Sequence, residues 1–110
     1  MHDLWAKAVA LKDPTGKTVV FVSTDLITVP IKMVDAVMAE ITRKHGIGRS
    51  EVMFTCSHTH CGPAVDDMLS YMLDMNDSDW RQVRSYQKTL NANLVGLISA
   101  ALKDLKPAAV

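Results

Sequence analysis

Two histidines, His58 and His60, stand one residue apart where a strand-forming run gives way to a polar turn. Residues 52–55 favour an extended strand, and the loop that ends a strand presents polar groups to solvent or substrate. Because residues i and i+2 of an extended chain point the same way, both imidazoles are expected to face one site. Neutral imidazole is a common zinc ligand, so the spacing indicates either a metal site or two loop histidines bonded to the backbone.

Two cysteines, Cys56 and Cys61, flank these histidines. Thiolates bind zinc strongly, so a cluster of Cys and His would suit a structural metal site, and a disulfide or redox pair is an alternative. Cys56 falls on the predicted strand, however, where a small buried hydrophobic residue is expected. Packing is therefore the favoured role of both thiols.

The first part of the chain predicts a β-hairpin. Residues 4–12 and 18–22 form two strand-like runs, and residues 13–16 (Asp-Pro-Thr-Gly) suit the turn between them. The run 18–22 is almost continuously β-branched and aromatic, which is typical of a strand that is covered on both faces. This strand is expected to end near Asp25.

An apolar stripe predicts a helix between Pro30 and Gly46. Its members recur every three to four residues: Ile31, Val34, Val37, Met38 and Ile41. With the strands before and after it, this helix forms a βαβ unit, which predicts parallel strands and a right-handed crossover. Asp25 and His58 are then expected at the carboxyl edge of the sheet, where open α/β sheets bind ligands. Asp25 could orient a metal-bound histidine or a loop amide there, or simply form a turn.

The rest of the chain predicts a short Met-rich helix and then a long helix. Met68, Met72 and Met75 fall on one side of the short helix, which would either pack on the core or line an acyl-chain groove. The pair Asp77-Ser78 is expected to cap the long helix, which would continue to Pro107, followed by the start of a strand at residues 108–110. Its buried stripe is expected to be Trp80, Val83, Leu90, Leu94, Leu97, Ile98, Ala101 and Leu105.

The composition of the chain excludes some classes of function. Twelve basic residues balance twelve acidic ones without a basic stripe, so nucleic acid is not expected as a partner. No apolar run reaches the roughly 18 residues of a transmembrane segment, and no signal-peptide pattern opens the chain. Apolar residues make up 48% of the 110 residues. The expected fold is α/β: a hairpin plus a right-handed βαβ unit, with a long C-terminal helix packed on a mixed sheet, as part of a larger domain.

The order of these motifs resembles the N-terminal domain of the neutral/alkaline non-lysosomal ceramidases. The resemblance is carried by residues 4–8, 20–26 and, most specifically, 57–63 (Ser-His-Thr-His-Cys-Gly-Pro), and it extends to residue 108. Family members hydrolyse the amide bond of ceramide at a zinc site, and they usually carry Ser at the position of Cys61. The resemblance implies that residues 1–110 are a fragment of the catalytic domain of such an enzyme.

By this resemblance, His58 is a ligand of Zn²⁺ and His60 is a catalytic residue beside the metal-bound water and the substrate carbonyl. The family's other ligands (a His, a Glu and a Tyr) and its catalytic Arg would lie beyond Val110. The chain would then hold one corner of an active site and be inactive alone. The implied partners are a ceramide-like lipid amide and the rest of the parent chain, and the implied location is secreted or membrane-peripheral.

Two other functions stay open. A metallohydrolase of the amidohydrolase type also uses a His-x-His motif, with both histidines on the metal. In that type the motif usually lies on the first barrel strand, whereas here a hairpin and a helix precede it. A non-catalytic, truncated homologue would keep the domain for interaction alone. A later His, Glu and Tyr in the parent gene would favour the ceramidase-like function.

Overall fold

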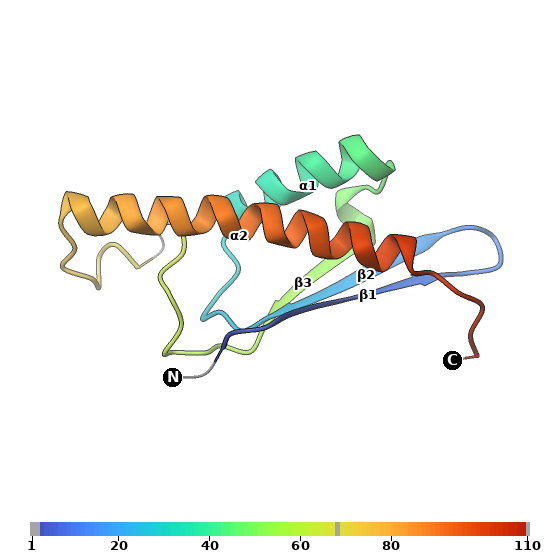
Figure 1. The fold of residues 1–110 in the computed structure, drawn as a ribbon, viewed down its shortest axis with the longest axis horizontal. Helices are drawn as coiled ribbons and strands as arrows, with labels where there is room; N and C mark the ends of the chain where they lie inside the picture. Colours follow the sequence, from blue (N-terminus) through green and yellow to red (C-terminus); the bar gives the residue numbers. More distant parts are fainter. Residues whose placement is uncertain (1–2, 68, 110) are drawn as a thin grey trace.

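The computed structural model describes residues 3–67 and 69–109, and it shows a sheet with two helices on one side (Figure 1). The sheet has three strands in the spatial order β1 (Ala6–Lys12), β2 (Thr18–Thr24) and β3 (Val52–Cys56). The helices are α1 (Ile31–His45) and α2 (Asp77–Lys103), and a short 3-10 turn, η1 (Arg49–Glu51), precedes β3. The expected α/β fold with a mixed sheet and a long C-terminal helix is confirmed.

The hairpin of β1 and β2 is antiparallel, and Ala6 pairs with Thr24 at its open end. In the turn, the N–H of Gly16 donates to the C=O of Asp13 at 3.0 Å, and Gly16 has a φ of 91°. Glycine adopts this left-handed conformation without the steric cost that a Cβ would bring. The turn therefore forms where the sequence predicts it.

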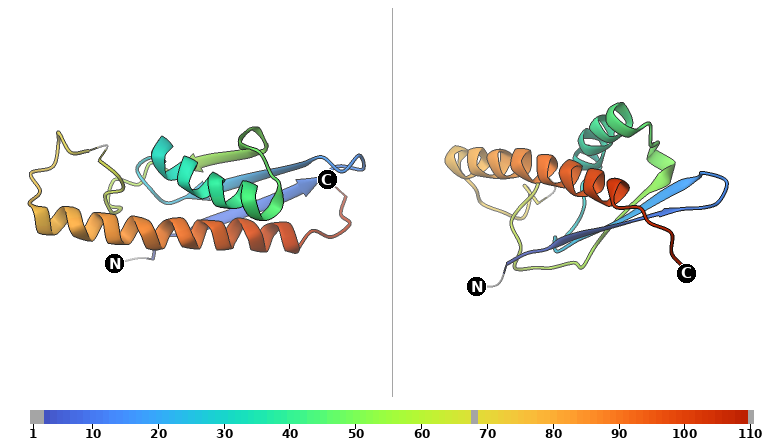
Figure 2. Two further views of the ribbon diagram at one scale, coloured as in Figure 1. Left: turned by 90° about the horizontal axis from the view of Figure 1, so that it is seen from above. Right: turned by 45° about the vertical axis from the view of Figure 1, so that its right-hand side comes forward.

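The unit β2-α1-β3 is a right-handed crossover between parallel strands (Figure 2). Val20 aligns with Val52 at one end of the pair, and Thr24 aligns with Cys56 at the other. The helix ends as expected at Gly46, whose φ is 70°. The carboxyl ends of β2 and β3 consequently lie at one edge of the sheet, and this edge carries the histidine turn.

The core lies between the sheet and the helices, and one face of the sheet stays open. The most fully buried side chains come from β2, α1 and α2: Val20, Val22, Met33, Val37, Ile41, Leu94 and Ile98. The expectation that residues 18–22 are covered on both faces is wrong, since Phe21 is 44% exposed. Both helices lie on the same side of the sheet (Figure 1), so alternate residues such as Val9, Phe21 and Met53 face outward.

The predicted stripe of α1 is buried with one exception, whereas in the predicted stripe of α2 Val83, Leu94 and Ile98 are buried and the other members are half-buried. Ile31 is 63% exposed, and Met33 takes its place in the core at 0% exposure. Ile31 is the first residue of α1, and helical side chains tilt toward the N-terminus. Its side chain therefore extends beyond the packed part of the helix.

The N-cap of α2 is Asn76 instead of the expected Asp77. The Asn76 side chain accepts hydrogen bonds from the backbone N–H groups of Ser78 (2.7 Å) and Asp79 (3.1 Å). The Asp79 carboxylate in turn accepts one from the N–H of Asn76 at 3.1 Å. This capping box satisfies N–H groups that the first helical turn leaves unpaired.

Two predictions for the last residues of the chain, the end of the long helix and the start of a further strand, also need correction. Helix α2 ends at Lys103, so its expected continuation to Pro107 is wrong. Residues 105–109 form neither helix nor strand, and Val110 lies outside the described residues.

The predicted Met-rich helix does not form in the described part of residues 64–76. Residues 69–72 form turns, and Met72 is 68% exposed. Met68 lies outside the described residues. A helix this short needs a surface on which to bury its apolar side, and the described residues offer none to Tyr71 and Met72, which are exposed.

Candidate functional site

The turn that follows β3 is attached directly to the segment that follows β2. The backbone N–H of Ser57 donates to the C=O of Thr24 at 3.0 Å, and the N–H of Thr59 donates to the C=O of Leu26 at 3.1 Å. The parallel pairing therefore continues past the ends of both strands. Residues 57–62, which we call the histidine turn, are fixed on the sheet and not free in solvent.

His58 and His60 lie side by side, but for a different reason from the one that the sequence suggests. The strand ends at Cys56, and His58 has a left-handed φ of 55°. The two ring centroids are 4.7 Å apart with an interplanar angle of 81°. A sharp turn brings the imidazoles together, where strand alternation was expected. A left-handed conformation at a residue with a Cβ costs about 1–2 kcal/mol, so the surrounding contacts must maintain it.

The ring of His58 is oriented by a backbone carbonyl. Its Nδ1 lies 2.7 Å from the carbonyl oxygen of Ile27. Because a carbonyl oxygen only accepts, Nδ1 carries the proton, and the neutral ring keeps its lone pair on Nε2. Histidines that bind metals commonly donate their other nitrogen to a carbonyl or a carboxylate in this way. The donor set at His58 therefore fits a metal ion at Nε2.

Asp25 lies at the same edge and acts on the backbone of the site. Its carboxylate accepts hydrogen bonds from the Ser57 hydroxyl and from the Trp5 N–H, both at 3.0 Å. The Ser57 hydroxyl also lies 2.7 Å from the hydroxyl of Thr59, between the two histidines. Among the roles open to Asp25, these contacts favour positioning of the loop over orientation of the His58 ring.

Gly62 closes the histidine turn at a point where the backbone is crowded. Its N–H donates to the C=O of Thr59 at 3.3 Å. A Cβ at this position would lie 3.3 Å from the carbonyl oxygen of Thr59 and 3.5 Å from that of Asp25. Glycine is favoured here because a Cβ would approach the Thr59 carbonyl closely, and not because of a left-handed φ.

The described side chains around the histidine turn do not by themselves form a cluster of possible metal ligands. No group of three or more His, Cys, Asp or Glu side chains gathers in the part of the chain that the structure describes. Both cysteines are free thiols; Cys56 is half-buried, and its Sγ lies 3.7 Å from the carbonyl oxygen of Ile27. Cys61 is exposed, so the expected packing role does not hold for it.

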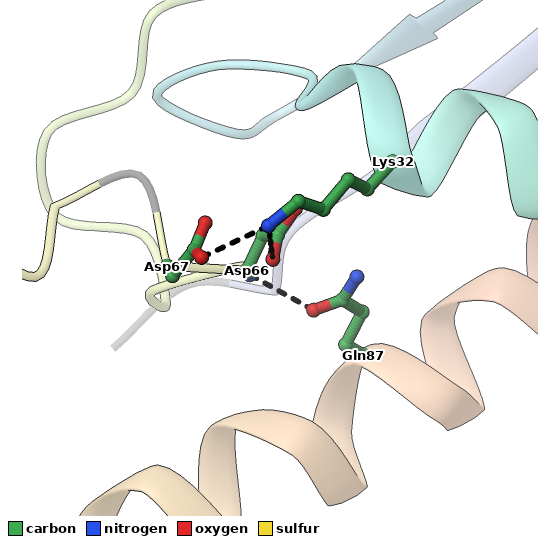
Figure 3. A network of polar contacts seen from close by, with 4 residues as sticks. All are labelled: Lys32, Asp66, Asp67 and Gln87. Atoms are coloured by element: carbon green, nitrogen blue, oxygen red, sulfur yellow. Dashed lines mark hydrogen bonds and ion pairs between the residues drawn. The ribbon is translucent and has the colours of Figure 1, made fainter.

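A second polar network follows the histidine turn and was not predicted (Figure 3). Lys32 Nζ, at the start of α1, lies 2.9 Å from Asp67 Oδ2 and 3.8 Å from Asp66 Oδ1. The N–H of Asp66, which has a φ of 56°, donates to the side-chain oxygen of Gln87 on α2 at 2.9 Å. The hydrogen bond between Lys32 and Asp67 raises the pKa of Lys32 and lowers the pKa of Asp67. The network ties the loop to both helices, and the only sequence signal for it was the Asp66-Asp67 pair.

Comparisons with protein-family models, with curated proteins and with solved structures find no match for this chain. The resemblance to the ceramidases therefore rests on the residues themselves, above all on the histidine turn. None of the helices in residues 3–67 and 69–109 is long and apolar enough to cross a membrane.

Proposed function

We propose that this chain forms one corner of the active site of a zinc-dependent amide hydrolase. The observation that carries the proposal is the geometry of His58. This residue holds an unfavourable backbone conformation, while the Ile27 carbonyl directs its Nδ1 inward and leaves Nε2 free to bind a metal. Backbone strain of this kind persists where surrounding contacts over-determine it, and it is concentrated at functional sites. A pair of loop histidines that merely bond to the backbone does not require it.

The chemistry of amide hydrolysis suits both histidines. A bound zinc ion would polarise the amide carbonyl and lower the pKa of a coordinated water to about 7. His58 would supply one nitrogen ligand in a fixed orientation. The ring of His60, 4.7 Å away between centroids, would accept a proton from the water and return it to the departing amine. Ceramide-like lipid amides are the proposed substrates because of the resemblance of residues 57–63 to the ceramidase motif.

The rest of the site would come from the parent chain. A catalytic zinc site commonly has three protein ligands, and the described residues offer fewer at this edge. His58, His60 and Cys61 are all exposed, so the edge is open to further residues. We therefore propose that the remaining ligands and a catalytic arginine lie elsewhere in the parent chain, and that residues 1–110 alone are inactive.

Zinc content and ceramide hydrolysis of the full-length parent test the proposal. His58→Ala should remove both the zinc and the activity. His60→Ala should keep the zinc and slow hydrolysis by about 10²–10⁴-fold, as expected for a lost proton-transfer residue. His45→Ala is the control, because His45 bonds to Ser99 between the two helices, away from this edge, and should leave both quantities unchanged.

Three outcomes would overturn parts of the proposal. Full zinc occupancy in His58→Ala would show that His58 is not a ligand. Loss of zinc in His60→Ala would make His60 a second ligand, as in enzymes of the amidohydrolase type. A wild-type parent that contains no zinc would support a non-catalytic homologue.

A further inference from the structure

The start of α2 carries a sequence motif that the proposed function does not use, Asn76-Asp77-Ser78. Asparagine followed by any residue except proline, and then by Ser or Thr, is the acceptor motif for N-linked glycans on the surface of secreted proteins. The other two asparagines of the chain, Asn91 and Asn93, are not followed by this pattern. Short motifs also arise by chance, so the structural setting of Asn76 has to carry the argument.

The motif lies on an open part of the surface. Asn76, Asp77 and Ser78 are all exposed, and they form the junction between an irregular loop and the first turn of α2. The first turns of α2 extend beyond the three strands, so this junction lies at one end of the molecule (Figures 1 and 2). A bulky hydrophilic group therefore has room at this position.

The N-cap contacts occupy the oxygen of the Asn76 side chain and leave its nitrogen available. Oδ1 accepts hydrogen bonds from the N–H groups of Ser78 at 2.7 Å and Asp79 at 3.1 Å. The first of these contacts is an Asx turn, in which an asparagine side chain bonds to the backbone two residues further on. Nδ2, the atom to which a glycan is attached, has no hydrogen bond to a described residue. The cap thus fixes the side chain without using the acceptor atom.

A group of exposed apolar side chains precedes the motif directly. Tyr71 is 82% exposed, Met72 68% and Leu73 37%. The N–H groups of Met72 and Leu73 both donate to the C=O of Leu69, at 2.9 and 3.0 Å, so a turn holds these residues together. Neighbouring exposed apolar side chains mark either an interaction site or an aggregation liability. A hydrophilic glycan at Asn76, a few residues further on, would shield this apolar turn.

We propose that Asn76 is the acceptor of an N-linked glycan, which is added during secretion and shields the apolar turn of residues 71–73. The glycan donor is an oligosaccharide joined through its first sugar to a lipid diphosphate, and the enzyme is an oligosaccharyltransferase. Nδ2 attacks C1 of that sugar; the N–C1 bond forms, the C1–O bond to the diphosphate breaks, and the lipid diphosphate leaves. Nδ2 gives up one of its two protons, whereas Oδ1 keeps its role as the N-cap of α2. This inference does not rest on the proposed enzymatic function.

Mass spectrometry of the full chain, secreted from eukaryotic cells behind a cleavable signal sequence, tests the proposal. The secreted chain should be heavier than its polypeptide, and an amidase that releases N-linked glycans should remove the excess mass. Release in ¹⁸O-labelled water leaves a labelled aspartate at each glycosylated position. The label is expected at position 76, and Asn91 and Asn93 should stay unlabelled.

Three variants separate the glycan from the helix cap. Asn76→Asp removes the acceptor nitrogen but keeps the cap, because Asp and Asn are about equally good N-cap residues. It should lose the glycan and keep the helix content of the wild type in circular dichroism. Ser78→Ala should also lose the glycan, whereas Ser78→Thr retains the hydroxyl of the motif and should keep it.

Binding of an apolar fluorescent dye measures the shielding. Asn76→Asp should bind more dye than the glycosylated wild type, because its apolar turn is uncovered. Replacing Tyr71 and Met72 together by serine should remove this difference, because the dye then loses its binding surface.

Three results would overturn the proposal. The first is a folded, secreted wild-type chain with the mass of the bare polypeptide. The second is a glycan that persists in Ser78→Ala or maps to another residue. The third is equal dye binding by the glycosylated wild type and Asn76→Asp, which would refute the shielding of the apolar turn.

Discussion

The two halves of the connection between β3 and α2 are held very differently. The histidine turn has backbone hydrogen bonds to Thr24 and Leu26, and side-chain contacts to Asp25 and Ile27. The later half, residues 64–76, is anchored mainly around Asp66, and beyond this anchor Tyr71 is 82% exposed and Met72 68% exposed. The chain is thus most constrained where the histidines lie, although both halves contain a residue with a left-handed φ.

This difference shows which half can hold a reacting geometry. A site must keep its groups within a fraction of an ångström of the productive arrangement, and several independent contacts achieve this better than one. In the histidine turn, four separate acceptors act on a short segment: three backbone carbonyls and the Asp25 carboxylate. The later loop is more suited to local movement, because few of its side chains are buried.

The largest predicted effect on stability is at Gly62, the residue that closes the histidine turn. Gly62→Ala should lower the free energy of unfolding by about 1–3 kcal/mol, because the new Cβ presses on the carbonyl oxygen of Thr59. The matched change Gly96→Ala, where a Cβ meets nothing within 4 Å in α2, should raise it by about 0.5–1 kcal/mol. Urea denaturation checks both values. Equal effects at the two glycines would show that the turn is not tightly fixed.

A smaller loss is expected when the carboxylate that joins β1 to the histidine turn is removed. Asp25→Ala should lower the free energy of unfolding by about 1–2 kcal/mol, since the Ser57 hydroxyl and the Trp5 N–H both lose their hydrogen bond to this carboxylate. Asp35→Ala, at an exposed position of α1, should change it by less than about 0.5 kcal/mol. Similar values for both variants in urea titrations would remove Asp25 from the positioning role.

Strain at His58 can be measured by comparing two variants at this position. His58→Gly should be more stable than His58→Ala by about 1 kcal/mol, because glycine relieves the left-handed strain and both variants lose the bond to Ile27. At His60, which does not have a positive φ, the glycine variant should be the less stable one. Thermal melts of the four variants decide the matter, and a His58→Ala protein as stable as His58→Gly would contradict the strain.

The smallest effect is expected in the later half of the connection. The Lys32–Asp67 pair is exposed, so Lys32→Met should lower the melting temperature only slightly, and salt should remove the difference. The pKa of Asp67 is lowered from 3.8 by the hydrogen bond from Lys32. The stability that this pair adds is therefore present above pH 3.8 and is lost as the pH falls through the folded-state pKa of Asp67. The pKa of Lys32 is raised from 10.5, so the stability that the pair adds is fully present below pH 10.5 and is lost as the pH rises through the folded-state pKa of Lys32. A difference that persists at high salt or at pH 2 would mean that the pair is more than a surface contact.

The strands, the crossover and the edge that holds the histidines were predictable because their signals are local. The apolar runs at residues 18–22 and 52–55, with a helical stripe and Gly46 between them, determine a βαβ unit. The open face of the sheet could not be predicted this way. A strand such as β2 looks the same in sequence whether its second face meets helices, another protein or solvent.

The predictions that were wrong in and around the site mostly depend on contacts between residues that are distant in the sequence. The left-handed turn at His58 is accompanied by a hydrogen bond from its Nδ1 to the carbonyl oxygen of Ile27, which is far away in the sequence, so the period of the strand could not reveal it. The Met-rich helix failed because a helical period is not enough without a surface to pack on. The wrong N-cap is a smaller error, since Asn76 and Asp77 are both good capping residues and only the geometry distinguishes them.

The tautomer of His58 tests most directly whether the histidine turn is built to present a metal ligand. In ¹⁵N-labelled full chain near neutral pH, NMR correlations from the ring protons distinguish a protonated Nδ1 from a protonated Nε2. We predict that His58 is locked with its proton on Nδ1, bonded to Ile27, and with its lone pair on Nε2. A proton on Nε2, or ring nitrogens averaged as in a freely exchanging histidine, would contradict this.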